Sequence, residues 1–185
     1  MPEVYEEPVI RLLNGQYFSL LNPDPAMIDL HCIALPLSRI CRYGGQTHDH
    51  YSVAEHSVHC VALARLVGAE RFEREIFMHD ATEAFIGDMV RPLKQIVPGY
   101  EYIEERIARA IRDRFGLCDL LQCRGWIRAI DSSMLRAEKQ HLYPEDTEEW
   151  SGMGSLDVSS IRLECWEPAR AYGEFTEMAN RLRIL

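Results

Sequence analysis

The feature that most constrains the fold of this chain is a recurring helical period in its apolar residues. The period is clearest in residues 100–115, where apolar or small side chains return every three or four positions. These side chains are Tyr100, Ile103, Ile107, Ala110, Ile111 and Phe115. Such spacing places them on one face of an α-helix, which must then pack against other elements. Gly116 follows directly and is suited to end the helix, because glycine readily adopts the left-handed conformation found there.

Similar patterns predict further helices and no convincing sheet. Ser52 opens a capping box, in which its hydroxyl accepts an N–H of the first turn while Glu55 reaches back, and the helix extends to about Val67. Residues 28–41 also suit a helix, which Pro36 would kink or divide into two short pieces. The other helices are expected at about residues 70–84, 124–142 and 168–182. We therefore expect an all-α fold.

The segments between these helices have the composition of loops. Residues 1–27 hold four prolines and an alternating patch at 16–21, which predicts an irregular lead-in with a short strand or hairpin. Residues 42–51 lack an apolar period, and residues 143–166 carry proline, glycines and several acids, as a long surface loop would. A length of 185 residues fits one domain, with the motifs described below between about 28 and 140.

The net charge of −9 argues against binding to duplex nucleic acid, because contact with the phosphate backbone requires clustered cations. A small phosphorylated substrate remains compatible, since a metal and a few local cations can overcome a negative global field. The chain has no apolar run of membrane-spanning length. Its six cysteines include no Cys-x-x-Cys pair. We expect a cytoplasmic protein with reduced thiols and no membrane partner.

Three positions place metal-ligand side chains where the helical pattern calls for apolar residues. His56 lies on the apolar face of its expected helix, and His79-Asp80 follows the apolar run 76–78. Asp131 interrupts the apolar stripe of residues 127–135. An ionised carboxylate on such a face is costly unless it is paired or binds a metal. Two imidazoles and two carboxylates suit one divalent ion such as Mn, Co, Zn or Mg.

Each of these positions has a simpler explanation when it is taken alone. A buried histidine is more often a hydrogen-bonded core residue than a ligand, and a buried aspartate more often caps a neighbouring loop. The occurrence of all three in order, each on a separate expected helix, favours the metal site. A bound ion would lower the pKa of water and offset phosphoryl charge, as hydrolysis of a phosphate ester requires. His48, Asp49 and His50 are more typical of an exposed loop than of a second metal site.

His56, His79-Asp80 and Asp131 together resemble the H…HD…D signature of HD-domain phosphohydrolases. The surrounding sequence is similar to the bacterial 5′-deoxynucleotidase branch, and more so to its small phage- and prophage-encoded relatives, which include a dATP triphosphohydrolase. The segments that carry this likeness are Ile33–Tyr43, Tyr51–Ser57, Met78–Ala84 and Gly87-Asp88. The resemblance implies a helical bundle with the metal between helices, in a bacterium or a phage-infected cell.

The resemblance also implies roles for residues other than the ligands. Glu83, four residues after His79 and so expected on the same helical face, would orient or deprotonate water, and Asp88 would be a second catalytic acid. Arg42 would bind phosphate, with Lys94 as a second candidate, and Tyr43 stands where relatives often have Trp near the sugar and base. Without the resemblance, the two cations would be interpreted as surface residues and Tyr43 as a core aromatic.

The expected reaction is hydrolysis of a small 2′-deoxynucleotide, either a 5′-monophosphate or a triphosphate cut at the α-phosphate. Two candidate phosphate cations suit a monophosphate slightly better. The same ligand set also occurs in alarmone and cyclic-nucleotide hydrolases, and a non-catalytic nucleotide-binding regulator is a further alternative. The resemblance implies a homo-oligomer.

Overall fold

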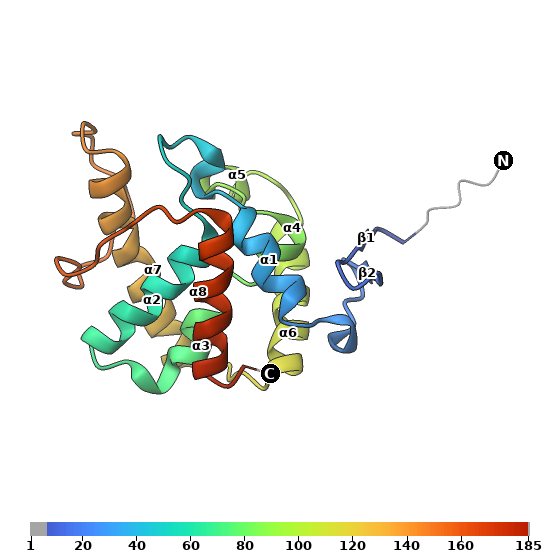
Figure 1. Ribbon diagram of the computed structural model, residues 1–185. Coiled ribbons are helices and arrows are strands. Elements are labelled where there is room, and N and C mark those ends of the chain that lie inside the picture. Colours follow the sequence, from blue (N-terminus) through green and yellow to red (C-terminus); the bar gives the residue numbers. More distant parts are fainter. Residues whose placement is uncertain (1–6, 185) are drawn as a thin grey trace.

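The computed structural model describes residues 7–184 and is mostly helical, which confirms the all-α prediction (Figure 1). The helices of this part of the chain are α1 (His31–Arg39), α2 (Val53–Leu66), α3 (Glu73–Phe77), α4 (Glu83–Ile86), α5 (Arg91–Lys94), α6 (Tyr100–Phe115), α7 (Leu121–Leu142) and α8 (Pro168–Arg181). The shorter elements are β1 (Val9–Arg11), β2 (Tyr17–Ser19), η1 (Pro25–Met27), η2 (Arg42–Gly45) and η3 (Glu70–Phe72). None of these helices is both long enough and apolar enough to cross a membrane.

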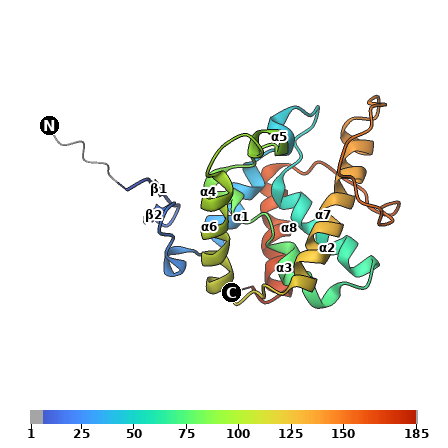
Figure 2. The same ribbon diagram turned by 180° about the vertical axis from the view of Figure 1, so that it is seen from behind.

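Helix α2 lies at the centre of the bundle and packs against α1, α3, α7 and α8 (Figures 1 and 2). Two apolar clusters form the core. One includes Ile33 of α1 and Phe175 of α8, and the other includes Leu63 of α2 and Met134 of α7. Helix α2 contributes to both, since Val61 belongs to the first cluster. This central position explains why ten of the fourteen residues of α2 are buried, polar ones included.

The start of α2 follows the predicted cap only in part. Ser52 Oγ accepts the N–H of Glu55 at 3.1 Å, as expected. The carboxylate of Glu55 does not reach back to residue 52. It accepts instead the backbone N–H groups of Glu164, Cys165 and Trp166 at 2.7–3.0 Å. Glu55 therefore fastens the segment before α8 to the central helix.

The prediction of a single helix at residues 70–84 is wrong. Helix α3 ends at Phe77, residues 78–82 form a turn, and α4 begins only at Glu83. His79 contributes to the break, because its Nδ1 donates to the carbonyl oxygen of Ile76 at 2.7 Å. His79 and Asp80 thus lie between two helices, and Glu83 does not share a helical face with His79.

Other boundaries agree closely with the sequence. Helix α6 covers the predicted residues 100–115 and ends at Gly116, whose φ is +61°. Helix α1, in contrast, continues through Pro36 as one element, so the alternative of two short pieces is wrong. The expected hairpin is β1–β2; it projects from the bundle in both views and is anchored by Phe18, whose ring centroid lies 4.7 Å from that of Phe85 (Figures 1 and 2). The part of the predicted lead-in at residues 1–6 lies outside the described residues.

The segment 143–166 forms a loop, but it is not confined to the surface. Val158, Ile161, Leu163 and Trp166 are buried against the core. Near its middle, the N–H of Gly154 donates to the carbonyl oxygen of Ser132 at 2.6 Å. A Cβ at residue 154 would lie 2.8 Å from the backbone nitrogen of Ser133, so only glycine allows this approach to α7.

Candidate metal centre

The four predicted ligands come from three parts of the fold and meet at one place. His56 lies in α2, His79 and Asp80 in the turn after α3, and Asp131 in α7. One ligand atom from each lies within 4.8 Å of all the others. From His56 Nε2, the distances are 3.4 Å to His79 Nε2, 3.5 Å to Asp80 Oδ2 and 3.5 Å to Asp131 Oδ1.

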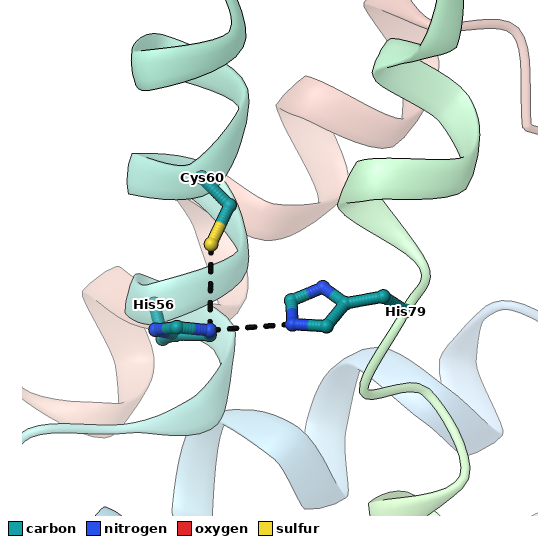
Figure 3. A group of neighbouring side chains, drawn as sticks. All are labelled: His56, Cys60 and His79. Carbon is teal, nitrogen blue, oxygen red and sulfur yellow. Dashed lines mark hydrogen bonds between the residues drawn. The ribbon is translucent and has the colours of Figure 1, made fainter. Parts of the chain in front are cut away.

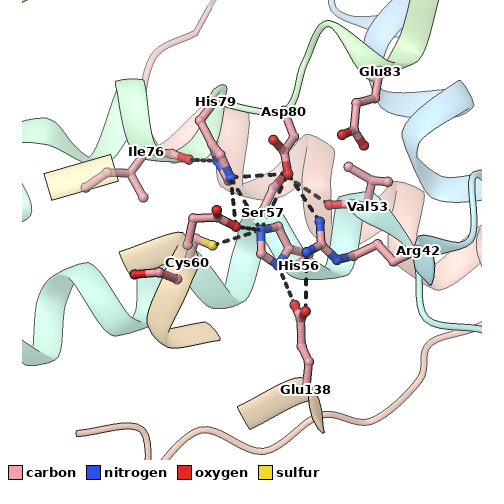
Figure 4. A network of polar contacts seen from close by, with 12 residues as sticks. Arg42, Val53, His56, Ser57, Cys60, Ile76, His79, Asp80, Glu83 and Glu138 are labelled. Atoms are coloured by element: carbon pink, nitrogen blue, oxygen red, sulfur yellow. Dashed lines mark hydrogen bonds and ion pairs between the residues drawn. The ribbon is translucent and has the colours of Figure 1, made fainter. Parts of the chain in front are cut away.

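Both histidines are oriented by a hydrogen bond from the nitrogen that faces away from the cluster (Figure 4). His56 Nδ1 donates to Glu138 Oε1 at 2.5 Å, and His79 Nδ1 donates to the carbonyl oxygen of Ile76 at 2.7 Å. Because each Nδ1 faces an acceptor, it carries a proton in either charge state of the ring. Burial opposes protonation of both rings, but neighbouring acidic groups outweigh it and raise the pKa of each ring well above its ordinary value. Each Nε2 faces the two aspartates and would bind a metal once it is deprotonated.

Glu138 is the main residue of the site that the sequence interpretation missed. Its fully buried carboxylate accepts hydrogen bonds from Tyr51 Oη at 3.0 Å, from Tyr43 Oη, and from His56. Burial alone would raise the pKa of Glu138, but Arg42 and His56 hold it at about 2. A signal was present, because Glu138 follows Asp131 by seven residues and so returns to the same face of α7.

Arg42 lies between the candidate ligands and Glu138 (Figure 4). Its Nη1 is 3.3 Å from Asp80 Oδ2 and its Nη2 is 3.3 Å from Glu138 Oε2. The guanidinium is almost wholly buried, and its Nε has no hydrogen-bond partner among the described residues. Arg42 thus holds a fixed positive charge beside the cluster with part of its donor capacity unused.

The donor set fits a divalent ion. Ions held at about 2.0–2.3 Å bring neighbouring ligand atoms to about 3 Å from one another, close to the distances found here. Two neutral imidazole nitrogens and two carboxylates match the preferences of Zn²⁺, Mn²⁺ and related ions. Cys60 lies one turn after His56, with Sγ 3.3 Å from His56 Nε2, and forms an overlapping group with the two histidines (Figure 3). The four-residue group is larger and supplies two negative charges, so we take it as the candidate site.

A pocket of about 540 Å³ opens beside this group. Asp80 and Asp131 form one wall, and the carboxyl groups of Glu83 and Asp88 lie in the lining with them. The volume falls within the range of sites that bind small molecules. Two of the predicted ligands and both predicted catalytic acids therefore face one cavity, although Glu83 reaches it from the start of α4.

The environment of the two carboxyl groups opposes their ionisation. Burial, together with Asp80 and Asp88, raises the pKa of Glu83 to about 9, and its Oε2 has no hydrogen-bond partner in the described part of the chain. Burial also raises the pKa of Asp88, with a further contribution from Asp80. Glu83 is thereby able to carry a proton near neutral pH. A cation held by Asp80 would lower both pKa values, because it offsets the charge that raises them.

The predicted substrate-binding residues also line this pocket. Lys94 is held by Glu104, with Nζ 2.9 Å from Oε1, and lies 3.7 Å from Glu83 Oε1. Tyr43 has a left-handed backbone with φ of +58°, which is strained for a residue with a side chain. Its ring centroid lies 5.9 Å from that of Trp150, a pocket residue from the loop 143–166 that sequence reasoning missed.

The remaining sequence candidates lie elsewhere. His48 and Asp49 are exposed, and His50 Nε2 is 3.2 Å from the carbonyl oxygen of Ser38. Within residues 7–184, none of the three belongs to a group of possible metal ligands. This agrees with their interpretation as loop residues.

The fold and the site define an all-α protein with a candidate divalent-metal centre between its helices. The chain belongs to the family of the uncharacterized protein YfdR of Escherichia coli K12, to which it is 34% identical over 179 residues, covering 95% of this chain and 96% of that one. It is also 35% identical over 140 residues to an uncharacterized protein of Rhodobacter capsulatus, covering 71% of each chain. No protein-family model matches the chain.

Proposed function

We propose that this protein is a metal-dependent phosphohydrolase of the HD-domain class that acts on 2′-deoxynucleotides, releasing phosphate from 5′-monophosphates. One observation carries the proposal. Four metal-ligand side chains converge, and two of them, Asp80 and Asp131, line a pocket that also holds two carboxyl groups and the cations Arg42 and Lys94. Phosphate-ester hydrolysis needs all three of these features together. The order of the ligands along the chain, which resembles the HD signature, supports the same class.

In this proposal, His56, His79, Asp80 and Asp131 would hold one divalent ion, which supplies Lewis acidity toward the phosphate and activates water. Arg42 and Lys94 bind the phosphate oxygens, because both line the pocket. The oxygen of water bonds to phosphorus and the bond from phosphorus to the 5′ oxygen breaks. One carboxyl of the pair formed by Glu83 and Asp88 accepts the proton that water loses, and the other donates a proton to the departing 5′ oxygen.

The direct test is an assay of phosphate release from dNMPs, NMPs and dNTPs with Mn²⁺, Co²⁺ or Mg²⁺ and with chelator. We expect activity that requires metal and a kcat/KM for dAMP about 5- to 150-fold above that for AMP, because a wall against the sugar leaves a 2′-hydroxyl without a hydrogen-bond partner. Equal values for both sugars would refute the deoxynucleotide assignment and favour the alarmone and cyclic-nucleotide alternatives. No turnover with any substrate, despite metal binding, would favour a regulator.

A second candidate substrate is a deoxynucleoside triphosphate. The observation in its favour is a third cation, Arg91 at the start of α5, which lines the pocket with Arg42 and Lys94. A longer phosphate chain recruits more cations than a monophosphate does. The products identify the reaction, since dATP cut at the α-phosphate yields inorganic triphosphate and deoxyadenosine, whereas dAMP yields orthophosphate and deoxyadenosine.

Tyr43 offers a test of how the pocket binds the nucleoside. We expect Tyr43→Ala to raise KM about tenfold and to reduce the preference for the deoxy sugar, since stacking of a base on an aromatic ring contributes about 1–3 kcal/mol. Tyr43→Phe keeps the ring and removes the hydrogen bond to Glu138. Steady-state kinetics with dAMP and AMP compare the three proteins. If KM rises equally in both variants, the hydroxyl rather than the ring is responsible, and the stacking role is wrong.

A further inference from the structure

A second group of metal-ligating side chains lies outside the centre described above, where α3 meets the start of α7. It consists of Glu75 in α3, Cys118 in the connection between α6 and α7, and Cys123 in the first turn of α7. One carboxylate oxygen and the two sulfur atoms lie within 4.8 Å of one another. Cys123 is buried and the other two residues are half-buried.

The local structure holds these three residues in place. Glu75 Oε1 accepts the N–H of Cys118 at 2.9 Å, which keeps the carboxylate against the connection that carries the first thiol. Asp119 and Arg124, which follow the two cysteines directly, form a bidentate pair with both N–O distances at 2.6 Å. This pair links residue 119 to residue 124, across the segment that carries the second thiol. It also occupies the Asp119 carboxylate, which leaves two sulfurs and one oxygen as the donor set.

We propose that Glu75, Cys118 and Cys123 form a second divalent-metal site, selective for Zn²⁺, with water as its fourth ligand. Thiolate ligands select zinc over Mg²⁺ and Mn²⁺, and two thiolates with one carboxylate leave a tetrahedral ion one open position. Space for that water is present, because all three residues border a cavity of about 690 Å³. The donor chemistry differs from that of the four-residue centre, so the two sites would prefer different ions.

The position of this site suggests what a bound ion does. Glu75 precedes His79 by about one helical turn, and Cys123 precedes Asp131 on α7 by about two turns. The same cavity is bordered by His79 and Asp80. An ion shared by α3 and α7 fastens α7, which carries Asp131, to the helix that leads directly into the turn with His79 and Asp80. It therefore stabilises the fold and the spacing of those ligands, whether or not the protein hydrolyses nucleotides.

Co²⁺ is a suitable probe because cobalt bound by thiolate has a sulfur-to-metal charge-transfer band in the near ultraviolet, whereas cobalt bound by nitrogen and oxygen does not. We expect the reduced full-length protein to show this band with Co²⁺ alone and to lose it when Zn²⁺ is added. The double variant Cys118→Ser/Cys123→Ser should lack the band. Cys60→Ser, which removes the thiol beside His56, should retain it. Loss of the band in Cys60→Ser with retention in the double variant would overturn the proposal.

Thermal unfolding gives a second readout in Asp80→Ala protein, in which the four-residue centre is disabled. Zn²⁺ at about a hundredfold above its dissociation constant should raise Tm by about 5–10 °C. The rise should disappear when the two cysteines are also replaced. If the double variant fails to fold, Glu75→Gln provides the same test, and we expect it to weaken zinc binding. An equal Tm rise with and without the cysteines would overturn the proposal. The proposal would also be overturned if the isolated protein contained a Cys118–Cys123 disulfide and did not bind zinc after reduction.

Discussion

Asp80→Ala should abolish hydrolysis, leaving less than a few per cent of the wild-type rate in buffer supplemented with metal. The substitution removes one of the two carboxylates of the cluster. Asp80 Oδ2 lies 3.2 Å from His79 Nε2 and 3.5 Å from His56 Nε2. The substitution also removes a partner of the buried Arg42 guanidinium. An ion at this site would lose both a ligand and a charge, and the phosphate would lose the cation that binds it most directly.

The loss should be specific to the site. We expect Asp80→Ala protein to keep its far-ultraviolet circular dichroism, because the two apolar clusters of the core do not include Asp80. Asp113→Ala is a matched control, since it removes an exposed carboxylate from α6. Phosphate release by the two variants and wild type should be measured with Mn²⁺, Co²⁺ and Mg²⁺ in excess. Substantial activity in Asp80→Ala protein would refute the metal centre as the site of hydrolysis.

The helices that could be predicted closely are those whose period and ends both appear in the sequence. Helix α6 is one example, since its apolar face and Gly116 define its length. The break between α3 and α4 had no such signal, because residues 78–82 contain neither glycine nor proline. The break depends on a side-chain hydrogen bond from His79 to a backbone carbonyl. Periodicity in the sequence does not report a bond of that kind.

The convergence of the four candidate ligands could be predicted because they stand where the apolar pattern is interrupted, whereas the residues that support them could not. Glu55 matched a local capping motif, yet its carboxylate binds backbone more than a hundred residues away. Trp150 lies in a loop whose path depends on the contact of Gly154 with α7. These roles depend on long-range packing, and a pattern read within one segment does not contain that information. Glu138 is the exception, because its spacing of seven residues from Asp131, which places both on one face of α7, was visible in the sequence.

Glu138→Ala should destabilise the fold as well as the site, by about 3–5 kcal/mol, because it removes the partner of a buried charge. Among the described residues, Arg42 would keep Asp80 as its ion-pair partner, and the hydroxyls of Tyr43 and Tyr51 would lose their acceptor. Metal affinity should fall about 10- to 100-fold, since Glu138 fixes the ring of His56 through Nδ1. Urea unfolding and isothermal titration with Mn²⁺ measure the two effects separately.

Two control variants separate the charge of Glu138 from its hydrogen bonds. Glu138→Gln keeps an amide oxygen that can accept from His56 and Tyr51 but loses the charge that faces Arg42, so its stability and metal affinity should lie between those of wild type and Glu138→Ala. Glu145→Ala removes an exposed charge three residues beyond the end of α7 and should match wild type in both measurements. If Glu138→Ala binds Mn²⁺ as tightly as Glu145→Ala does, Glu138 does not position His56. If it is also equally stable, the buried network around Arg42 does not stabilise the fold.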